Sequence, residues 1–456
     1  MRHILFLALF FFSFSLFAQT WHPVGSPGIS AGHASYVSLA MNAGGVPYVA
    51  YEDAANYNAV TVMKYGDSSW ENIGSPGFTY ANPYPGATYV SMAIGNNDTA
   101  YVAYSDSYDT SRVSVMKYNG YYWELVGNEG FSTGMASFTA MTIGKNGTLY
   151  VAYRNATVGG VAVMKYAAGS GGSWGAVGHL GSLMAAQGYK WIATDTASAP
   201  YVAFIDGSHA DRITVMKYAD TGWETVGSAG FSAGVALKPS IAIGQDGTPY
   251  VTYVDEANGY KATVMTYTGG SWVNVGSAGL SVGEVSYPSI AIDASGTPYV
   301  GYEDMGNGGK ATVMKYSDGN WATVGSAGCS DSETVFTTIT IDPGGTPYLA
   351  YEDYGNGEKA TVLRYRFAAG IQNVNIAVAS FSVSPNPSNG SFTLHIKSIQ
   401  KESATIIITN MLGEKVKQFT GATNEDIAVQ VGAVPGVYFV SAITSQGRQS
   451  AKIEVW

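Results

Sequence analysis

Short apolar runs of strand length, separated by turn residues, recur along most of the chain. One repeat contains SIAI from Ser289, PYVGY from Pro298, ATVMKY from Ala311 and WATVG from Trp321. Runs this short favour strands over helices. The pair Asn307-Gly308 between the second and third runs is a strong hairpin signal, because both residues tolerate positive φ. Each repeat is therefore predicted to form four antiparallel strands.

A tryptophan recurs at the start of the fourth run, followed by two variable residues, an aliphatic residue and glycine. The spacing between successive tryptophans is 49 to 53 residues, and they are Trp21, Trp70, Trp123, Trp174, Trp223, Trp272 and Trp321. Four strands repeated at this period indicate a β-propeller. The segment Trp21–Gly25 precedes the first full repeat, whereas the last repeat lacks its tryptophan strand. We therefore predict an all-β fold in which residues 21–369 form a seven-bladed β-propeller closed by its N-terminal strand.

Composition supports this prediction and excludes some partners. Charged residues make up 12% of the chain, while glycine (57) and tyrosine (33) are abundant, which suits strands and turns. The net charge is −10 and no basic stripe is present, which argues against nucleic acid as a partner. A single cysteine excludes an intrachain disulfide bond.

The first residues are typical of an export signal. Arg2 precedes an apolar run, and Ala18 provides a small residue for cleavage, so residues 1–18 are predicted to be a signal peptide. No other apolar run approaches the length of a membrane span, and the mature chain is expected to lack one.

An acidic residue recurs where the second strand of a repeat ends. These residues are Asp53, Asp106, Asp206, Asp255, Asp304 and Asp353, and the third repeat has Asn155 instead. The side chain could close the hairpin by accepting a backbone N–H, which asparagine does equally well. Alternatively, the six carboxylates could form an acidic ring that binds Ca²⁺ or sugar hydroxyls. Glu52, Glu303 and Glu352 add acid beside three of these positions and are harder to explain as turn formers.

The repeated tryptophans have two interpretations, stacking on sugar rings or packing between blades. Trp191 is a different case, because it replaces a small residue found in the other repeats. It either fills a local gap or offers a platform for a ligand, and we keep it among the candidate binding residues.

Catalytic patterns are missing from the sequence. The six histidines lack the spacing of zinc ligands, and no phosphate-binding loop is present. No histidine and acid recur beside Cys329 in a way that suggests a nucleophile. We therefore predict no catalytic residues and no cofactor, with Ca²⁺ at the acidic residues as the only metal considered.

The end of the chain has a different pattern. Residues 370–382 read as a linker, and residues 383–456 contain strand-rich segments with glycine-centred turns, which predict a small β-sandwich. This region resembles the type A C-terminal sorting domain of the Bacteroidetes type IX (Por) secretion system. The residues that carry the resemblance are Pro385, Asn386, Pro387, Gly390, Gly413, Gly436, Tyr438 and Lys452. The resemblance implies export by the type IX machinery, removal of the tail, and release or attachment at the cell surface.

Taken together, these features predict a secreted or cell-surface binding protein of the adhesion type, not an enzyme, with a glycan or another protein as its ligand. One alternative is a carbohydrate-active enzyme with a site in the irregular second to fourth repeats, near Asp106, Arg154, Trp191 or Asp206. Another is a passive scaffold in the surface coat.

Overall fold

The computed structural model describes residues 20–79, 86–107, 109–157, 159–167, 172–178, 180, 191–219, 222–366, 381–397, 401–410, 415–432, 434–444 and 447–456. The chain divides into two compact units. The predicted signal peptide lies outside the described residues, and so does most of the predicted linker.

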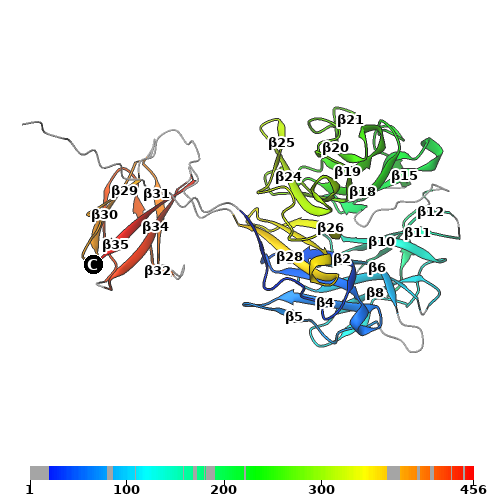
Figure 1. Cartoon of the computed structure of the whole chain (residues 1–456), viewed down its shortest axis with the longest axis horizontal. Helices are drawn as coiled ribbons and strands as arrows, with labels where there is room; N and C mark the ends of the chain where they lie inside the picture. The colour runs from blue at the N-terminus through cyan, green and yellow to red at the C-terminus, as the bar shows by residue number, and fades with distance from the viewer. Residues whose placement is uncertain are drawn as a thin grey trace, which may run out of the picture. The chain divides into compact units, whose positions relative to one another are not determined.

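In the first unit, each complete repeat forms one four-stranded antiparallel sheet with its strands in chain order (Figure 1). The first three sheets are β2 (Ala34–Met41), β3 (Pro47–Asp53), β4 (Ala59–Tyr65) and β5 (Trp70–Asn72); β6 (Ala87–Ile94), β7 (Ala100–Asp106), β8 (Arg112–Tyr118) and β9 (Trp123–Leu125); and β10 (Ala136–Ile143), β11 (Leu149–Asn155), β12 (Gly160–Tyr166) and β13 (Gly175–Ala176).

The next three sheets have the same order. They are β14 (Ile192–Thr194), β15 (Pro200–Asp206), β16 (Arg212–Ala219) and β17 (Gly222–Thr225); β18 (Ala236–Ile243), β19 (Pro249–Asp255), β20 (Lys261–Thr268) and β21 (Ser271–Asn274); and β22 (Val285–Ile292), β23 (Pro298–Asp304), β24 (Lys310–Ser317) and β25 (Asn320–Thr323). Short 3₁₀ turns follow the second strand in several sheets: η1 (Ala54–Asn56), η2 (Gly207–His209), η3 (Glu256–Asn258), η4 (Met305–Asn307) and η5 (Tyr354–Asn356).

The last sheet of this unit combines both ends of the repeat region. It contains β26 (Thr334–Ile341), β27 (Pro347–Asp353), β28 (Lys359–Arg366) and β1 (Thr20–Pro23), in the order β1-β28-β27-β26. β1 pairs antiparallel with β28, and Trp21 lies opposite Tyr365. The opening segment therefore occupies the place of the tryptophan strand that the last repeat lacks.

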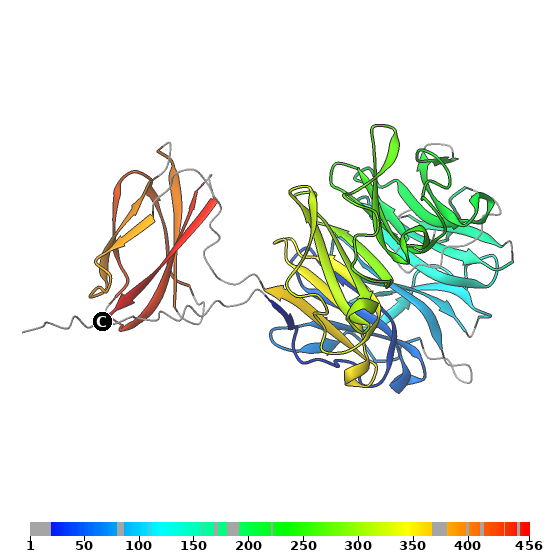
Figure 2. The same ribbon diagram turned by 45° about the horizontal axis from the view of Figure 1, so that its top comes forward.

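Neighbouring sheets are joined through their first strands. β2 contacts β6, and the contacts continue through β10, β14, β18, β22 and β26, which also contacts β2 (Figure 2). The described residues 20–366 thus form seven four-stranded sheets in a propeller-like arrangement.

The tryptophans connect each sheet to the one before it. The indole Nε1–H of Trp70 donates to the carbonyl oxygen of Val24 (2.6 Å), and that of Trp123 donates to Ile73 (2.7 Å). The same bond is made by the remaining five, Trp21, Trp174, Trp223, Trp272 and Trp321, to Val324, Val126, Val177, Val226 and Val275. In each case the acceptor is the aliphatic residue of the preceding tryptophan phrase, so the recurring tryptophan has a packing role.

The glycine after that aliphatic residue is explained by the same contact. Gly74 has a φ of 75°, and a Cβ atom placed on it would lie only 2.8 Å from Cδ1 of Trp123. Only glycine meets both requirements, the left-handed backbone and the close approach of the indole.

The second unit is a small two-sheet structure. One sheet contains β29 (Phe381–Ser384), β30 (Ser391–Ile396) and β33 (Asp426–Gln430); the other contains β32 (Lys415–Ala422), β31 (Ser403–Asn410), β34 (Gly436–Thr444) and β35 (Gly447–Val455). Leu394, Ile406 and Val440 come from both sheets and share one buried core. β29 begins at Phe381, slightly before the boundary at residue 383 that the sequence predicts.

Candidate functional site

The recurring aspartates are buried within their hairpins. All six are at most 4% exposed. In the sixth repeat, the carboxylate of Asp304 accepts hydrogen bonds from Gly306 N (3.1 Å), Asn307 Nδ2 (2.8 Å) and Thr312 Oγ1 (2.7 Å). The Thr312 hydroxyl in turn accepts the N–H of Gly328 (2.8 Å), which belongs to the following loop. This chain from aspartate to threonine to glycine, here called the hairpin latch, holds the loops together.

The latch recurs in most repeats. Thr61, Thr214, Thr263 and Thr361 donate to Asp53, Asp206, Asp255 and Asp353 at 2.7 to 2.8 Å, and Ser114 donates to Asp106 at 3.5 Å. Asn155 accepts the N–H of Thr157 (2.9 Å) in the third repeat. This geometry agrees with the hairpin interpretation of the six aspartates, and their carboxylates offer little exposed surface to Ca²⁺ or a sugar.

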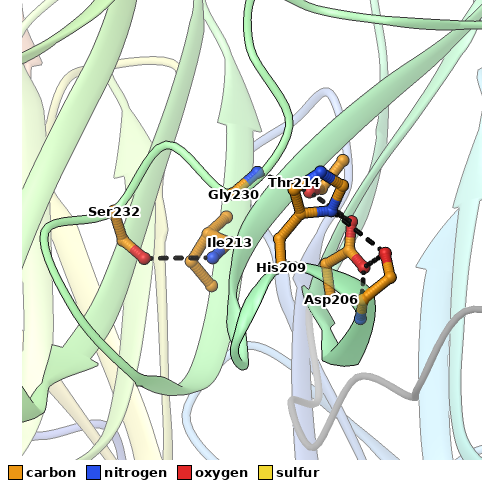
Figure 3. A network of polar contacts seen from close by, with 7 residues as sticks. Asp206, His209, Ile213, Thr214, Gly230 and Ser232 are labelled. Atoms are coloured by element: carbon orange, nitrogen blue, oxygen red, sulfur yellow. Dashed lines mark hydrogen bonds and ion pairs between the residues drawn. The ribbon is translucent and has the colours of Figure 1, made fainter.

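The fourth repeat shows the latch with a histidine in it (Figure 3). His209 occupies the position of Asn307, and its Nδ1 lies 2.9 Å from Oδ2 of Asp206. The Ser208 hydroxyl lies 3.0 Å from the same Nδ1 atom. A hydrolytic triad needs the serine at the opposite ring nitrogen from the aspartate. The three residues therefore form a structural network rather than an activated nucleophile.

Trp191 lies in the core. Its side chain has 0% exposure, and its Nε1–H donates to the carbonyl oxygen of Phe138 (2.8 Å). It packs in a cluster with Ile192 and Phe204. This burial agrees with the gap-filling interpretation and leaves no ring face on which a ligand could stack.

The first strands carry a feature that the sequence analysis missed. In six of them the register with the second strand shifts, and a residue at the shift has positive φ. These residues are Tyr36 (52°), Tyr89 (55°), Phe138 (53°), Lys238 (49°), Tyr287 (45°) and Phe336 (52°), here called the channel ring. The equivalent position in the fourth repeat is Tyr189, which lies outside the described residues. Recurring aromatic residues at this repeat position were the signal that could have revealed the ring.

The channel-ring side chains touch one another in sequence. Ring centroids are 4.9 to 5.1 Å apart for the pairs Phe138–Tyr89, Tyr89–Tyr36, Tyr36–Phe336 and Phe336–Tyr287. Lys238 Nζ lies 3.6 Å from the centroid of Tyr287, a cation–π contact. All six side chains are partly exposed. They form a continuous band contributed by six sheets.

The band borders a cavity of about 320 Å³ that is lined by residues of all seven first strands. Tyr36, Lys238, Tyr287 and Phe336 are among the lining residues. The rest of the lining mixes aliphatic side chains with several serines and threonines. A concave site that combines apolar walls with placed polar groups is the usual form of a ligand site.

Three carboxylates lie next to three neighbouring residues of the channel ring. Glu52, Glu303 and Glu352 are the cross-strand partners of Ser35, Ser286 and Val335, which directly precede Tyr36, Tyr287 and Phe336. Their sheets are neighbours, because β26 contacts both β22 and β2.

Burial changes the acidity of these three groups. It raises the pKa of Glu52 to about 7, and the nearby carboxylate of Glu352 adds to the effect. It also raises the pKa of Glu303 to about 7, although the positive charge of Lys238 opposes the shift. Burial raises the pKa of Glu352 as well, against the influence of His33. Of the nine acids predicted to bind a ligand, these three are the ones beside the cavity-lining residues.

One group of side chains has the composition of a metal site. His33, Glu352 and Glu358 each offer a donor atom, and these atoms lie within 4.8 Å of one another.

In the second unit, one residue of the predicted sorting signal, Asn386, binds the last strand of the chain. Asn386 Nδ2 donates to Lys452 O (2.8 Å), and its Oδ1 accepts the N–H of Glu454 (2.9 Å). The Tyr438 hydroxyl donates to Val434 O (3.0 Å). Pro385 and Pro387 follow cis peptide bonds, Gly390 has positive φ, and β34 begins at Gly436. Gly413 lies outside the described residues.

Residues 382–455 match the family model of the secretion system C-terminal sorting domain. The sorting domain marks this protein for export to the cell surface or the medium. Among the described residues, no helix has the length and apolar character to span a membrane.

Solved structures with weak similarity include a protein of unknown function from Dyadobacter fermentans (12% identity, 76% of this chain and 99% of that chain covered, TM-score 0.45). They also include a lectin from Aleuria aurantia (15%, 66% and 99%, 0.43) and an α-L-arabinanase from Penicillium chrysogenum (12%, 64% and 96%, 0.42). At TM-scores this low, the similarity supports no inference about ligand or reaction. A search of the curated proteins finds no match to this chain.

Proposed function

We propose that this protein is an exported binding protein that holds a glycan or protein ligand at the channel ring. The observation that carries the proposal is the ring itself. Backbone strain of this kind costs roughly 1–3 kcal/mol per residue and persists mainly at functional sites. Here it recurs at one position of six sheets, and three of the five aromatic residues concerned, Tyr36, Tyr287 and Phe336, line one cavity.

The seven sheets would serve as the blades of a propeller closed by its N-terminal strand. Three observations support this closure: β1 lies in the last sheet, β26 contacts β2, and Trp70 bonds to Val24 just as the other tryptophans bond to the preceding repeat. A closed ring provides a rigid frame for the channel ring.

The chemistry of the site suits both predicted ligand classes. Aromatic faces pack against the apolar faces of sugars and against the side chains of lysine and arginine. The carboxylates of Glu52, Glu303 and Glu352 supply acceptors for sugar hydroxyls or for basic groups.

The test is a screen of the purified protein on a glycan array and on a peptide array. We expect binding on one of them, weakened at least about tenfold by the double substitution of Tyr287 and Phe336 with alanine. The matched control is Tyr121→Ala, because Tyr121 is 88% exposed in the turn between β8 and β9, away from the cavity-lining residues.

The other outcomes are equally informative. Binding that survives the double substitution would move the site away from the channel ring. Turnover of a polysaccharide would favour the carbohydrate-active enzyme. The absence of binding on both arrays would favour the passive scaffold.

A further inference from the structure

The seam between the first and last sheets holds a set of side chains found at no other described seam. His33 precedes β2, whereas Glu352 lies on β27 and Glu358 in the loop before β28. His33 Nε2 lies 3.2 Å from Glu352 Oε1, and His33 Nδ1 lies 3.5 Å from Glu358 Oε2. These residues come from opposite ends of the repeat region and join two sheets.

The repeat architecture shows how unusual this set is. The main-chain carbonyl of Glu358 accepts the N–H of Ala34, the residue after His33. The equivalent main-chain bond is made at the other described seams. The residues at the positions of His33 and Glu358 in those seams are Gly86 and Asn58, Met135 and Ser111, Val235 and Asp211, Glu284 and Tyr260, and Glu333 and Gly309. None of these pairs combines a histidine with an acid. The fold therefore does not require the set at the first seam.

An ion pair alone leaves part of this cluster unexplained. Glu352 is only 4% exposed, and although Oε1 contacts His33, the buried Oε2 atom has no hydrogen-bond partner among the described residues. Buried carboxylate oxygens are normally satisfied. An ion coordinated by this carboxylate would satisfy Oε2.

The distances also suit a metal ion. Zinc binds nitrogen and oxygen ligands at about 2.0–2.2 Å, so two ligands of one ion lie roughly 3–4 Å apart. The contact of His33 Nε2 with Glu352 Oε1 falls in this range. Glu358 contacts the opposite ring nitrogen, so its side chain must turn to share one ion with Nε2 and Glu352. The side chains of His33 and Glu358 are 42% and 44% exposed, which leaves them room to adjust, while Glu352 is fixed by burial.

We infer that His33, Glu352 and Glu358 form a binding site for a divalent transition-metal ion of the zinc type. The imidazole ligand selects zinc and its neighbours over Ca²⁺ and Mg²⁺, which take oxygen ligands. The site clamps the first sheet to the last. It shares Glu352 with the acceptors proposed beside the channel ring, whereas His33 and Glu358 belong to the metal site alone.

Calorimetric titration of the chelator-treated full chain with ZnCl₂ tests the site. We expect one ion per chain, with the affinity reduced at least about tenfold in His33→Ala and in Glu352→Gln. His209→Asn is the matched control, because His209 also contacts a buried carboxylate and asparagine occupies its place in other hairpins. This variant should bind zinc like the unmodified protein.

Thermal unfolding provides a second measurement. Zinc should raise the unfolding midpoint of the unmodified chain but not that of His33→Ala, since the ion links sheets from opposite ends of the repeat region. Glu358→Gln, at an exposed position, keeps the test valid if Glu352→Gln folds poorly. Undiminished zinc affinity in both His33→Ala and Glu358→Gln, or no zinc binding by the unmodified chain, would overturn the inference.

Discussion

At the scale of single residues, two kinds of unfavourable feature occur together beside one cavity. Six non-glycine residues of the channel ring have left-handed backbone conformations. The carboxyl groups of Glu303 and Glu352, directly behind the ring, are 5% and 4% exposed. Each feature lowers stability in the unliganded protein, and a bound ligand with complementary groups would compensate for it.

The buried carboxyl of Glu303 predicts a pH dependence of stability. Its pKa is raised to about 7, so the folded protein holds a proton that the unfolded chain releases near pH 4.5. This stabilising contribution is complete below about pH 4.5 and is lost as the pH rises through about 7. Between pH 5 and 8 the free energy of unfolding should therefore fall by about 1–2 kcal/mol more in the unmodified protein than in Glu303→Gln.

Urea unfolding at both pH values measures this difference. Glu71→Gln is the control, since Glu71 is exposed on β5 and its substitution should leave the pH dependence unchanged. Equal slopes for the unmodified protein and Glu303→Gln would show that Glu303 titrates normally.

At the scale of secondary-structure elements, the hairpin latch explains the repeated acidic phrase. One aspartate oxygen binds both a 3₁₀-turn side chain and a strand threonine, which then binds the next loop. Two loops from different parts of a repeat are thereby fixed by one carboxylate.

Loss of the latch aspartate should be costly. Asp304→Ala removes three hydrogen bonds and leaves the Thr312 hydroxyl and Asn307 amide without this acceptor, so we expect a loss of about 2–4 kcal/mol in unfolding free energy. Asp304→Asn should cost less, because Asn155 holds the corresponding hairpin in the third repeat. Chemical denaturation measures both values, with the exposed Asp67→Ala as the control.

A double-mutant cycle that combines Asp304→Ala with Thr312→Val separates the loss of the latch hydrogen bond from the other effects of each substitution. The two substitutions should be less than additive by about 1 kcal/mol, because each removes the same bond. Full additivity would mean that the aspartate and threonine act independently.

The hydrogen bonds that the recurring tryptophans make between neighbouring sheets give a further prediction. Trp21→Phe and Trp123→Phe each remove one indole N–H donor, from Val324 O and Ile73 O respectively. If the contact made by the opening segment is equivalent to those between other sheets, each substitution should lower the unfolding free energy by about 1–2 kcal/mol. Denaturant unfolding of both variants makes the comparison. A negligible effect of Trp21→Phe beside a normal effect of Trp123→Phe would show that the opening segment packs loosely against the last repeat.

At the scale of the whole molecule, the repeat pattern predicts much of what the structure contains. The tryptophan spacing and hairpin signals predict the four-stranded sheets, and the unmatched segment at Trp21 predicts the pairing of β1 with β28. These features depend on local patterns and on their repetition, which a single sequence displays.

The candidate site was harder to predict for physical reasons. Tyrosine and phenylalanine rarely adopt positive φ, so local preference gives no sign of the register shift at Tyr36. The contact of His33 with Glu352 joins residues 319 positions apart, and no spacing rule indicates it. The burial of Trp191 likewise depends on the sheets that surround it.

The proposed closure predicts unequal effects of removing the two ends of the described chain. Deleting residues 20–30 removes β1, the Trp21–Val324 bond, and the Ser30 hydroxyl that accepts the N–H of Ala360. It also leaves the edge of β28 unpaired, so the unfolding midpoint of the first unit should fall by at least about 5 °C.

Deleting residues 381–456 removes only the second compact unit, which has its own core. The midpoint of the first unit should then stay within about 1 °C of its original value. Calorimetric melting of the full chain and both truncations makes the comparison. An unchanged midpoint after loss of residues 20–30 would show that the ring does not depend on its opening strand, because an edge left open at β28 would then cost nothing.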